Sequence, residues 1–286
     1  MQRYRCVQCN KTFQSKRRKV NKIRNLWNDY VWGKQNLKQI AKKESRSIEW
    51  VRNQFDTIII AKKEVVPQTT VIIVDTTFFG RTWGVCVFRA PHLKKNFCWQ
   101  GVDREIMSHY YYGRMILEEK GWKFTAAVVD GKRGMVKVFN DIPVQVCQFH
   151  QMKNVTRYIT RKPETNHGKA LRQVMLTLPS CNEKDFAKLL TDWKQTYQYV
   201  LTDKTYILGT NRWYFTHKKT RSAYYSMERN MPYLFTYLKY PELNIPNTTN
   251  SLDGFFTHLK DKVDIHHGLQ KDRRYKVIEE ILGGEN

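Results

Sequence analysis

Three features of the sequence predict a mixed α/β fold. A run of β-branched residues from Thr70 to Val74 has the character of a strand buried at the centre of a sheet. A second apolar run, Phe124 to Val129, has the same character, and helical periodicity dominates from about residue 150 onward. With 286 residues, 41% of them hydrophobic, the chain is long enough to enclose a core.

The first 64 residues differ in character and are expected to form a separate DNA-binding region. Leu37 to Lys43 has a helical pattern and is followed by a short polar turn, after which Ser47 can cap a second helix. Helix pairs of this kind are typical of helix-turn-helix proteins, although they also occur in proteins that never touch DNA. The candidate DNA contacts are the outward residues Arg52 and Asn53 and the basic run Lys16, Arg17 and Arg18.

Cys6 and Cys9 form a Cys-x-x-Cys pair near the N-terminus, which resembles one knuckle of a zinc ribbon. The pair supplies a zinc half-site at most. Three interpretations stay open: an upstream knuckle is missing because the chain is shortened, which we favour, or other ligands complete the site, or the pair binds no metal. The N-terminal region is therefore expected to combine a partial zinc ribbon with the helix-turn-helix.

Residues 65–286 are expected to form one catalytic domain built on a sheet. Strands are predicted over Thr70–Val74, Thr82–Arg89 and Asn96–Val102, followed by a helix over 104–120 and strands over Phe124–Val129 and Val144–Cys147. The order βββαβαβ is that of a ribonuclease H-like sheet. A mainly α-helical insertion is expected from about 150 to 246, and an amphipathic helix from Ser251 closes the domain.

The charge balance points to a polyanionic partner. Lys and Arg number 50 against 26 Asp and Glu, which gives a formal net charge of +24, spread along the whole chain. Nucleic acid is the expected partner. The alternative is a basic surface that serves only solubility, which explains so large an excess of charge less well. No stretch approaches the ~18 apolar residues of a membrane span, so no membrane partner and a cytoplasmic location are expected. Six cysteines suit thiols or metal ligands better than disulfides.

Two aspartates, Asp75 and Asp130, directly follow the two buried strands, and Asp253 lies in the first turn of the closing helix. A ribonuclease H-like sheet would bring the first two side by side, with Asp253 completing the set. Cleavage and joining of phosphodiesters need converging carboxylates that hold two Mg²⁺ ions, or Mn²⁺, about 4 Å apart. All three aspartates are therefore predicted to be catalytic metal ligands.

Each aspartate also has a structural interpretation. Asp is a common turn residue after a strand, although two such residues on neighbouring strands repel each other unless a cation offsets their charge. Asp253 could instead complete a capping box in which Asn250 is the N-cap and Asp253 the third helical residue.

The chain resembles the transposases of bacterial insertion sequences related to the eukaryotic Mutator elements. The resemblance covers nearly the whole chain and rests on three segments: Val74-Asp75, Val129-Asp130-Gly131 followed by Cys147-Gln148-Phe149-His150, and Thr248-Thr249-Asn250-Ser251-Leu252-Asp253-Gly254. It implies an Asp, Asp, Glu triad carried over to Asp75, Asp130 and Asp253. The last acid departs from the family pattern, because Asp replaces the usual Glu and shortens the arm by about one methylene.

Further residues carry separate hypotheses. Cys147 and His150 have the spacing of a zinc half-site, but without other ligands nearby a structural or DNA-proximal role is favoured. Trp213 and Lys218, in an aromatic and basic stretch of the insertion, are candidates to stack on unpaired bases and bind phosphates, against the alternative that the aromatics form the insertion's core.

These inferences predict a DDE/D-type DNA transposase that binds the terminal repeats of its element and catalyses metal-dependent strand cleavage and strand transfer. Its partners would be double-stranded DNA at the element ends and the target, in the bacterial nucleoid, with a homodimer or larger assembly during synapsis. Two alternatives stay open: a decayed transposase or DNA-binding regulator without turnover, and a structure-specific nuclease on the same fold.

Overall fold

The computed structural model describes residues 3–13, 17–61, 65–81 and 83–284, with the side chains of residues 17–21 left aside. The protein is a mixed α/β molecule. It divides into two compact units, Met1–Glu64 with Phe255–Asn286, and Val65–Gly254. The sequence predicts two domains, residues 1–64 and 65–286, and these domain limits stay a prediction. Among the described residues, we find no helix with the length and apolar character that crossing a membrane would require.

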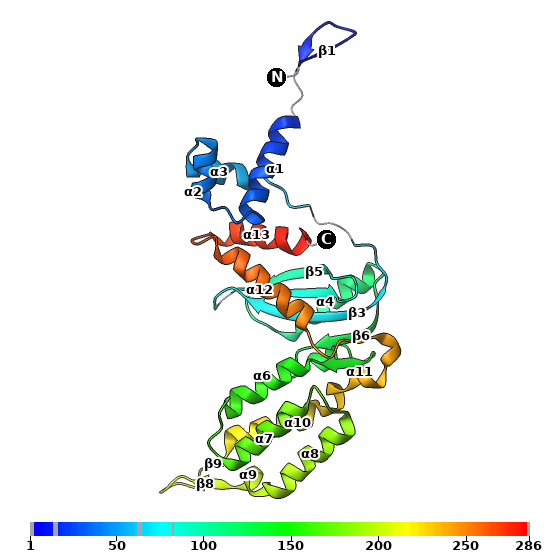
Figure 1. Ribbon diagram of the computed structural model, residues 1–286, viewed down its shortest axis with the longest axis vertical. Coiled ribbons are helices and arrows are strands. Elements are labelled where there is room, and N and C mark those ends of the chain that lie inside the picture. The colour runs from blue at the N-terminus through cyan, green and yellow to red at the C-terminus, as the bar shows by residue number, and fades with distance from the viewer. Residues whose placement is uncertain (1–2, 14–16, 62–64, 82, 285–286) are drawn as a thin grey trace. The chain divides into compact units, whose positions relative to one another are not determined.

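The unit Val65–Gly254 contains a five-stranded mixed sheet in the order β5-β4-β3-β6-β7 (Figure 1). Strands β5, β4 and β3 run antiparallel, whereas β3, β6 and β7 run parallel. The strands are β3 (Thr69–Phe78), β4 (Gly84–Ala90), β5 (Lys95–Val102), β6 (Lys123–Val129) and β7 (Val144–Val146). Every residue of β4 is buried, and β3 and β6 are buried over most of their length, as their continuous apolar runs require.

The first predicted strand is longer than its apolar run suggests. It was expected to end at Asp75, but β3 continues to Phe78. The two partners of β3 explain the difference. Pairing with the parallel strand β6 ends at Val74, opposite Val129, whereas pairing with the antiparallel strand β4 continues from Asp75 to Phe78. Asp75 is therefore the first residue of β3 that pairs only with β4 and no longer with β6.

Helix α4 (Met107–Glu119) packs closely on β4 and β5. A β-carbon added to Gly113 would lie 2.2 Å from the Phe88 ring, so only glycine allows the helix to approach this near. The buried helix residues Tyr110 and Leu117 join the core of the sheet. These are the residues whose spacing predicted the helix.

Most of the other helices of this unit form a separate block (Figure 1). Helix α10 packs against α6, α7, α8 and β7, so that block and sheet share one hydrophobic core. The elements of the block are α6 (Gln148–Ile159), α7 (Asn166–Thr177), α8 (Glu183–Thr196), α9 (Gln198–Thr202), α10 (Lys218–Leu234), α11 (Thr236–Lys239) and the 3-10 helix η1 (Pro241–Leu243). The short helix α5 (Met135–Val138) instead packs on α4. The block also contains a hairpin of β8 (Lys204–Tyr206) and β9 (Trp213–Phe215), which helical periodicity did not predict.

The other unit contains the N-terminal helices and the C-terminal end of the chain. Its elements are β1 (Tyr4–Arg5), β2 (Thr12–Phe13), α1 (Arg17–Val31), α2 (Leu37–Glu44), α3 (Ile48–Asp56) and α13 (Lys271–Gly284). Helix α12 (Asn250–Asp264) begins in Val65–Gly254 and continues into this unit. Helix α1 packs on α2, α3 and α13. Sequence patterning did not predict α13, whose turns mix charged and apolar residues.

Candidate metal centre and basic pocket

Asp75 and Asp130 come from adjacent parallel strands. Because Val74 of β3 pairs with Val129 of β6, the aspartate that follows each lies at the same edge of the sheet. Asp75 is buried, with 8% of its surface exposed, and its Oδ1 accepts a hydrogen bond of 2.8 Å from the backbone N–H of Thr76. The sheet topology thus brings the two carboxyl groups together, although the two aspartates lie far apart in the sequence.

Asp75 lies close to two side chains from other elements. Potential ligand atoms of Asp75, His150 and Asp253 are all within 4.8 Å of one another. The His150 imidazole comes from the first turn of α6, and Asp253 comes from the first turn of α12. Asp130 is not part of this close group. Two carboxylates and an imidazole are a donor set suited to a divalent cation.

The segment that leads into α12 is hydrogen-bonded to the start of α6. The backbone N–H of Gln148 donates to the carbonyl of Asn247 at 3.0 Å, and the N–H of Thr249 donates to Cys147 Sγ at 3.3 Å. The same sulfur caps α6 by accepting from the N–H of His150 at 3.5 Å. Cys147 is fully buried and accepts these bonds. His150, its partner in the sequence motif, instead lies among the carboxylates.

The Thr249 hydroxyl connects His150 to Asp253. Its Oγ1 donates to Asp253 Oδ2 at 2.7 Å and lies 3.2 Å from His150 Nδ1. On the other side of the imidazole, His150 Nε2 lies 3.8 Å from Asp253 Oδ1. These contacts tie the orientation of the Asp253 carboxylate to that of the His150 imidazole.

Burial and nearby charges shift the pKa values of the two aspartates and of His150. Burial, together with the nearby charges of Asp253 and Asp130, raises the pKa of Asp75 to about 7, although His150 and the hydrogen bond from the Thr76 N–H oppose the shift. Burial likewise raises the pKa of Asp130. For His150, burial lowers the pKa, but the hydrogen bond with Cys147 and the carboxylates outweigh it and raise the pKa to about 9. Perturbed carboxyl groups of this kind gather at functional sites.

Asp130 and His150 line an open pocket of about 500 Å³ whose other walls are strongly basic. Five cationic side chains surround it, with Glu105 as the second acid. They are Lys132, Arg133, Lys153, Arg157 and Arg229. A pocket with this charge, next to a group of carboxylates, favours a phosphate-bearing ligand over a neutral one.

One face of α6 supplies much of this pocket. Lys153, Asn154 and Arg157 follow His150 at three, four and seven residues, which is the spacing of a single helix face. Sequence analysis did not identify these residues as part of the site. The signal was present, because a helix beginning at the Cys147 to His150 motif would align them with the imidazole.

Glu105 is a second residue that sequence analysis missed. Its Oε1 accepts a hydrogen bond of 2.6 Å from Tyr110, and its Oε2 pairs with Lys132 at 2.9 Å. Tyr110 also lies 2.7 Å from the Thr76 hydroxyl, next to Asp75. No sequence signal distinguished Glu105, since an acid just before a helix is an ordinary capping residue.

A buried polar network supports the loop after β6. Asn230 of α10 donates to Gln151 Oε1 of α6 at 2.8 Å and lies 3.5 Å from the Gly131 carbonyl. A β-carbon on Gly131 would lie 2.7 Å from the Asn230 amide. The helical insertion thereby braces the loop that follows Asp130.

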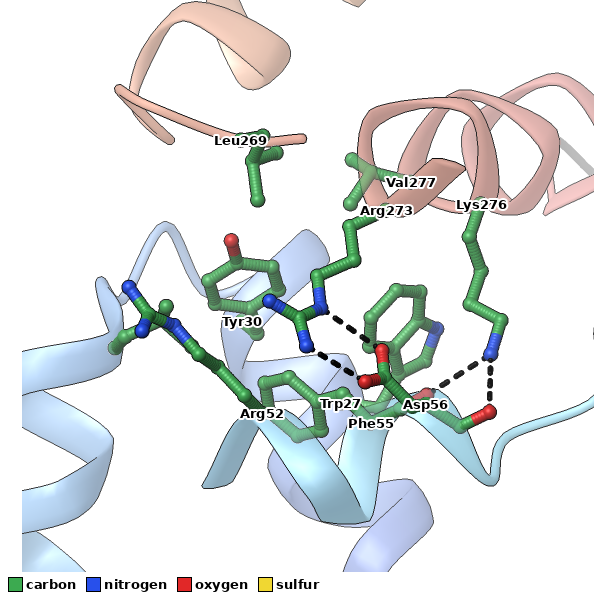
Figure 2. Close-up of a pocket in the computed structure, with 10 residues that line it drawn as sticks. Trp27, Tyr30, Arg52, Phe55, Asp56, Leu269, Arg273, Lys276 and Val277 are labelled. Carbon is green, nitrogen blue, oxygen red and sulfur yellow. Dashed lines mark hydrogen bonds and ion pairs between the residues drawn. The ribbon is translucent and has the colours of Figure 1, made fainter. Parts of the chain in front are cut away.

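The candidate DNA contacts Arg52 and Asn53 lie on α3, the second helix of the predicted helix-turn-helix. Ser47 caps this helix by accepting from the Trp50 N–H at 3.1 Å. Asn53 is exposed, and the half-buried Arg52 lies 3.3 Å from Glu49. Figure 2 shows Arg52 beside a small apolar pocket between α1, α3 and α13.

Other predicted contacts lie elsewhere or outside the described residues. Lys16 lies outside them, as do the side chains of Arg17 and Arg18, which are the first two residues of α1. Trp213 is 44% exposed on β9, and Lys218 is exposed at the start of α10. Sequence patterning considered an aromatic core for this stretch, whereas Trp213 lies outside the core.

Cys6 and Cys9 lie on the turn of the β1–β2 hairpin. Hydrogen bonds from the backbone of Cys9 and Gln8 lower the pKa of Cys6, which favours its thiolate. Within the described ranges, however, no third ligand joins the two cysteines in a group that could hold a metal ion. Zinc binding at this pair therefore stays a prediction.

Models of known protein families and curated protein sequences give no match to this chain.

Proposed function

We propose that this protein is a DNA transposase that cuts and joins DNA strands with divalent metal ions. The observation that carries the proposal is the meeting of Asp75, His150 and Asp253 within 4.8 Å, next to a basic pocket that contains Asp130. An acidic metal centre beside cationic side chains is the arrangement that phosphodiester chemistry needs, because the metal and the phosphates must meet.

The sheet supports a ribonuclease H-like assignment for residues 65–254. If the five strands are numbered 1 to 5 along the chain, their order in the sheet is 3-2-1-4-5. Neighbours among the first three strands are antiparallel, and the last two strands are parallel to the central strand. This is the topology expected from the order βββαβαβ. It also explains why carboxylates of the first and fourth strands are neighbours.

In this proposal the chain's own residues have separate tasks. Asp75, Asp130 and Asp253 would hold Mg²⁺ or Mn²⁺, which when bound supplies activation of the attacking oxygen and stabilisation of the leaving oxygen. Thr249 orients Asp253 and His150 through its hydroxyl group. The cations of the basic pocket would bind the phosphates that flank the cleaved bond.

DNA recognition in this proposal belongs to the other unit. Helices α2 and α3 would form the helix-turn-helix that reads the element ends, and the net charge of +24 would add affinity for any DNA. Synapsis of two ends would require a dimer or a larger assembly.

Cleavage of DNA by the purified full-length protein tests the proposal. The substrate is a duplex that carries the DNA flanking the coding sequence on each side, incubated with Mg²⁺ or Mn²⁺. We expect Asp75→Asn and Asp130→Asn each to lower cleavage on the order of 100-fold or more. DNA binding, measured by gel shift, should be nearly unchanged because neither variant alters a cationic side chain.

Asp192→Asn is the matched control, because Asp192 is exposed on α8, away from the site. It should cleave like the wild type. Near wild-type cleavage by Asp75→Asn or Asp130→Asn would refute the metal-site assignment. DNA binding without cleavage by the wild type would instead support the alternative of a regulator without turnover, and cleavage without preference for the flanking DNA would support a nuclease.

A further inference from the structure

The β8–β9 hairpin carries an unusual concentration of exposed apolar side chains. Leu208 at its tip is 100% exposed and Tyr206 is 68% exposed. Ile207, Trp213 and Tyr214 are also exposed large hydrophobic residues. Figure 1 shows the hairpin extending away from the helices of its unit. Apolar side chains gathered on one projecting element mark a binding surface more often than chance exposure.

The turn of the hairpin holds its tip in a defined shape. The Ile207 N–H donates to the Arg212 carbonyl at 2.9 Å, and the Thr210 N–H donates to the Ile207 carbonyl at 3.1 Å. Gly209 adopts a φ of +77°, which suits glycine in this position of a turn. Leu208 precedes it at the apex, so the closed turn presents this side chain outward.

One face of the hairpin combines aromatic rings with cations. Tyr206 pairs across the strands with Trp213, and Lys204 pairs with Phe215. The Lys204 Nζ lies 4.0 Å from the Trp213 ring centre. The guanidinium carbon of Arg221 lies 3.7 Å from the Phe215 ring centre. Cations held against rings keep the rings in place while their charge stays available to a phosphate.

The charge around the hairpin identifies the partner. Residues 203–221 contain five Lys or Arg and a single acid, Asp203, which is paired with His217 at 3.9 Å. Two copies of such a hairpin would repel each other, so a second copy of this chain is a poor occupant. A nucleic acid offers both the phosphates for the cations and the flat bases for the rings.

In a regular duplex, the flat faces of the bases are covered by neighbouring base pairs. The aromatic rings of this hairpin can therefore stack only on bases that are unpaired or unstacked. We propose that the β8–β9 hairpin binds distorted DNA, with Leu208 inserted at an opened base step and Trp213 and Tyr206 stacked on the exposed bases. This inference rests on the proposed function for its partner, DNA, but not on the metal centre or on cleavage.

Binding to matched duplexes in EDTA tests the inference without cleavage. One duplex is fully paired, and the other has the same length with a short mismatched bubble that carries 2-aminopurine. The full-length wild type should prefer the bubble and change the fluorescence of the 2-aminopurine. Leu208→Ser and Trp213→Ala should each lower affinity for the bubble about tenfold and leave affinity for the paired duplex unchanged. Trp213→Phe, which keeps a ring, should retain most of the preference.

Leu238→Ser is the control, because Leu238 is also exposed but lies on α11. It should bind both duplexes like the wild type. An equal loss on both duplexes, or no loss, in the Leu208 and Trp213 variants would overturn the inference and leave the proposed function standing. A change of oligomeric state in these variants, measured by light scattering, would also overturn it in favour of a second copy. Failure of the wild type to bind either duplex would refute the proposed function itself.

Discussion

The hydroxyl of Thr249 donates a hydrogen bond to Asp253 Oδ2 at 2.7 Å and lies 3.2 Å from His150 Nδ1. Helix α12 begins at Asn250, so Thr249 is the residue just before the helix and Asp253 is its fourth residue. The capping box considered from the sequence needs Asp253 at the third position, after an Asn250 cap. Asp253 instead accepts a hydrogen bond from Thr249, which also contacts the His150 imidazole of the candidate metal centre.

Removal of the Thr249 hydroxyl should weaken metal binding. Thr249 is fully buried, and valine has nearly the same shape, so Thr249→Val removes the bridge without opening a cavity. We expect its affinity for Mn²⁺, measured by calorimetry, to fall about 10- to 100-fold, as for other residues that orient a metal ligand. Thr249→Ser keeps the hydroxyl and should restore most of the affinity. Equal affinity in the valine and serine variants would show that the bridge does not position the site.

Much of the sheet was predictable because its inner strands β3, β4 and β6 are mostly buried. The apolar runs of β3 and β6 and the helix periodicity of α4 come directly from this burial. The β8–β9 hairpin escaped prediction because its strands have three residues each and their side chains are partly exposed, so no core imposes an alternating pattern.

The candidate site was predictable only in part. Asp75 and Asp130 carry a signal because each follows an apolar strand, and adjacent parallel strands end at one edge. The place of His150 depends on hydrogen bonds between segments 99 and 102 residues apart in the chain, through Thr249 and Cys147. No local pattern encodes contacts of that length. Glu105 was missed for another reason, because an acid just before a helix is an ordinary capping residue.

The end of helix α3 is held by two residues of α13 (Figure 2). Arg273 donates two hydrogen bonds to the Asp56 carboxylate, at 2.9 and 2.7 Å, and Lys276 Nζ donates to the carbonyls of Phe55 and Asp56 at 3.0 and 2.9 Å. A cation at the carboxyl end of a helix satisfies its free carbonyls and opposes its dipole. The predicted recognition helix is therefore anchored by the other end of the chain.

Arg273→Ala should destabilise the protein in a pH-dependent way. The hydrogen bond from Arg273 lowers the pKa of Asp56 below 3.8. The ion pair therefore contributes its full stability above pH 3.8 and loses it as the pH falls through the lowered value. We expect a loss of about 1 kcal/mol or less at neutral pH, because the pair is partly exposed. Urea unfolding at pH 7 and at pH values well below 3.8 measures this difference.

Lys271→Ala is the control on the same helix, because Lys271 is exposed. It should unfold like the wild type at every pH. A difference between Arg273→Ala and the wild type that stays constant at low pH would contradict a role for the Asp56 carboxylate.

Sequence discrimination should depend on the exposed side of α3 and not on the start of α10. Asn53→Ala and Arg52→Ala should lower the preference for the DNA flanking the coding sequence over random DNA, because a recognition helix reads base edges. Lys218→Ala should weaken binding to both DNAs equally and reduce the salt dependence by about one counterion. Competition binding at several salt concentrations separates the two effects. Asn53→Ala is the cleaner variant, since Arg52 also lines the apolar pocket.

Equal losses on both DNAs for Asn53→Ala would show that α3 only binds phosphates. If Lys218→Ala lowered affinity for the flanking DNA more than for random DNA, the helical insertion would contribute to base recognition.

Asp253 allows the sharpest test, because hydrogen-bond acceptance and metal binding make different demands on one carboxylate. The Thr249 hydroxyl needs only an acceptor, which the amide oxygen of Asp253→Asn would still offer, so the fold should lose about 1 kcal/mol or less. A divalent cation needs the negative charge as well, and cleavage by the same variant should therefore fall on the order of 100-fold or more.

The length of the side chain gives a second measurement at the same position. Thr249 holds Asp253 Oδ2 at 2.7 Å, and with this short arm the carboxylate already lies within 4.8 Å of ligand atoms of Asp75 and His150. Asp253→Glu would push the carboxylate past this position, so we expect slower cleavage. Asp261→Asn, an exposed change on the same helix, should leave cleavage unaffected. Faster cleavage by Asp253→Glu would mean that the pocket still suits the longer acid, and full cleavage by a folded Asp253→Asn protein would remove Asp253 from the metal centre.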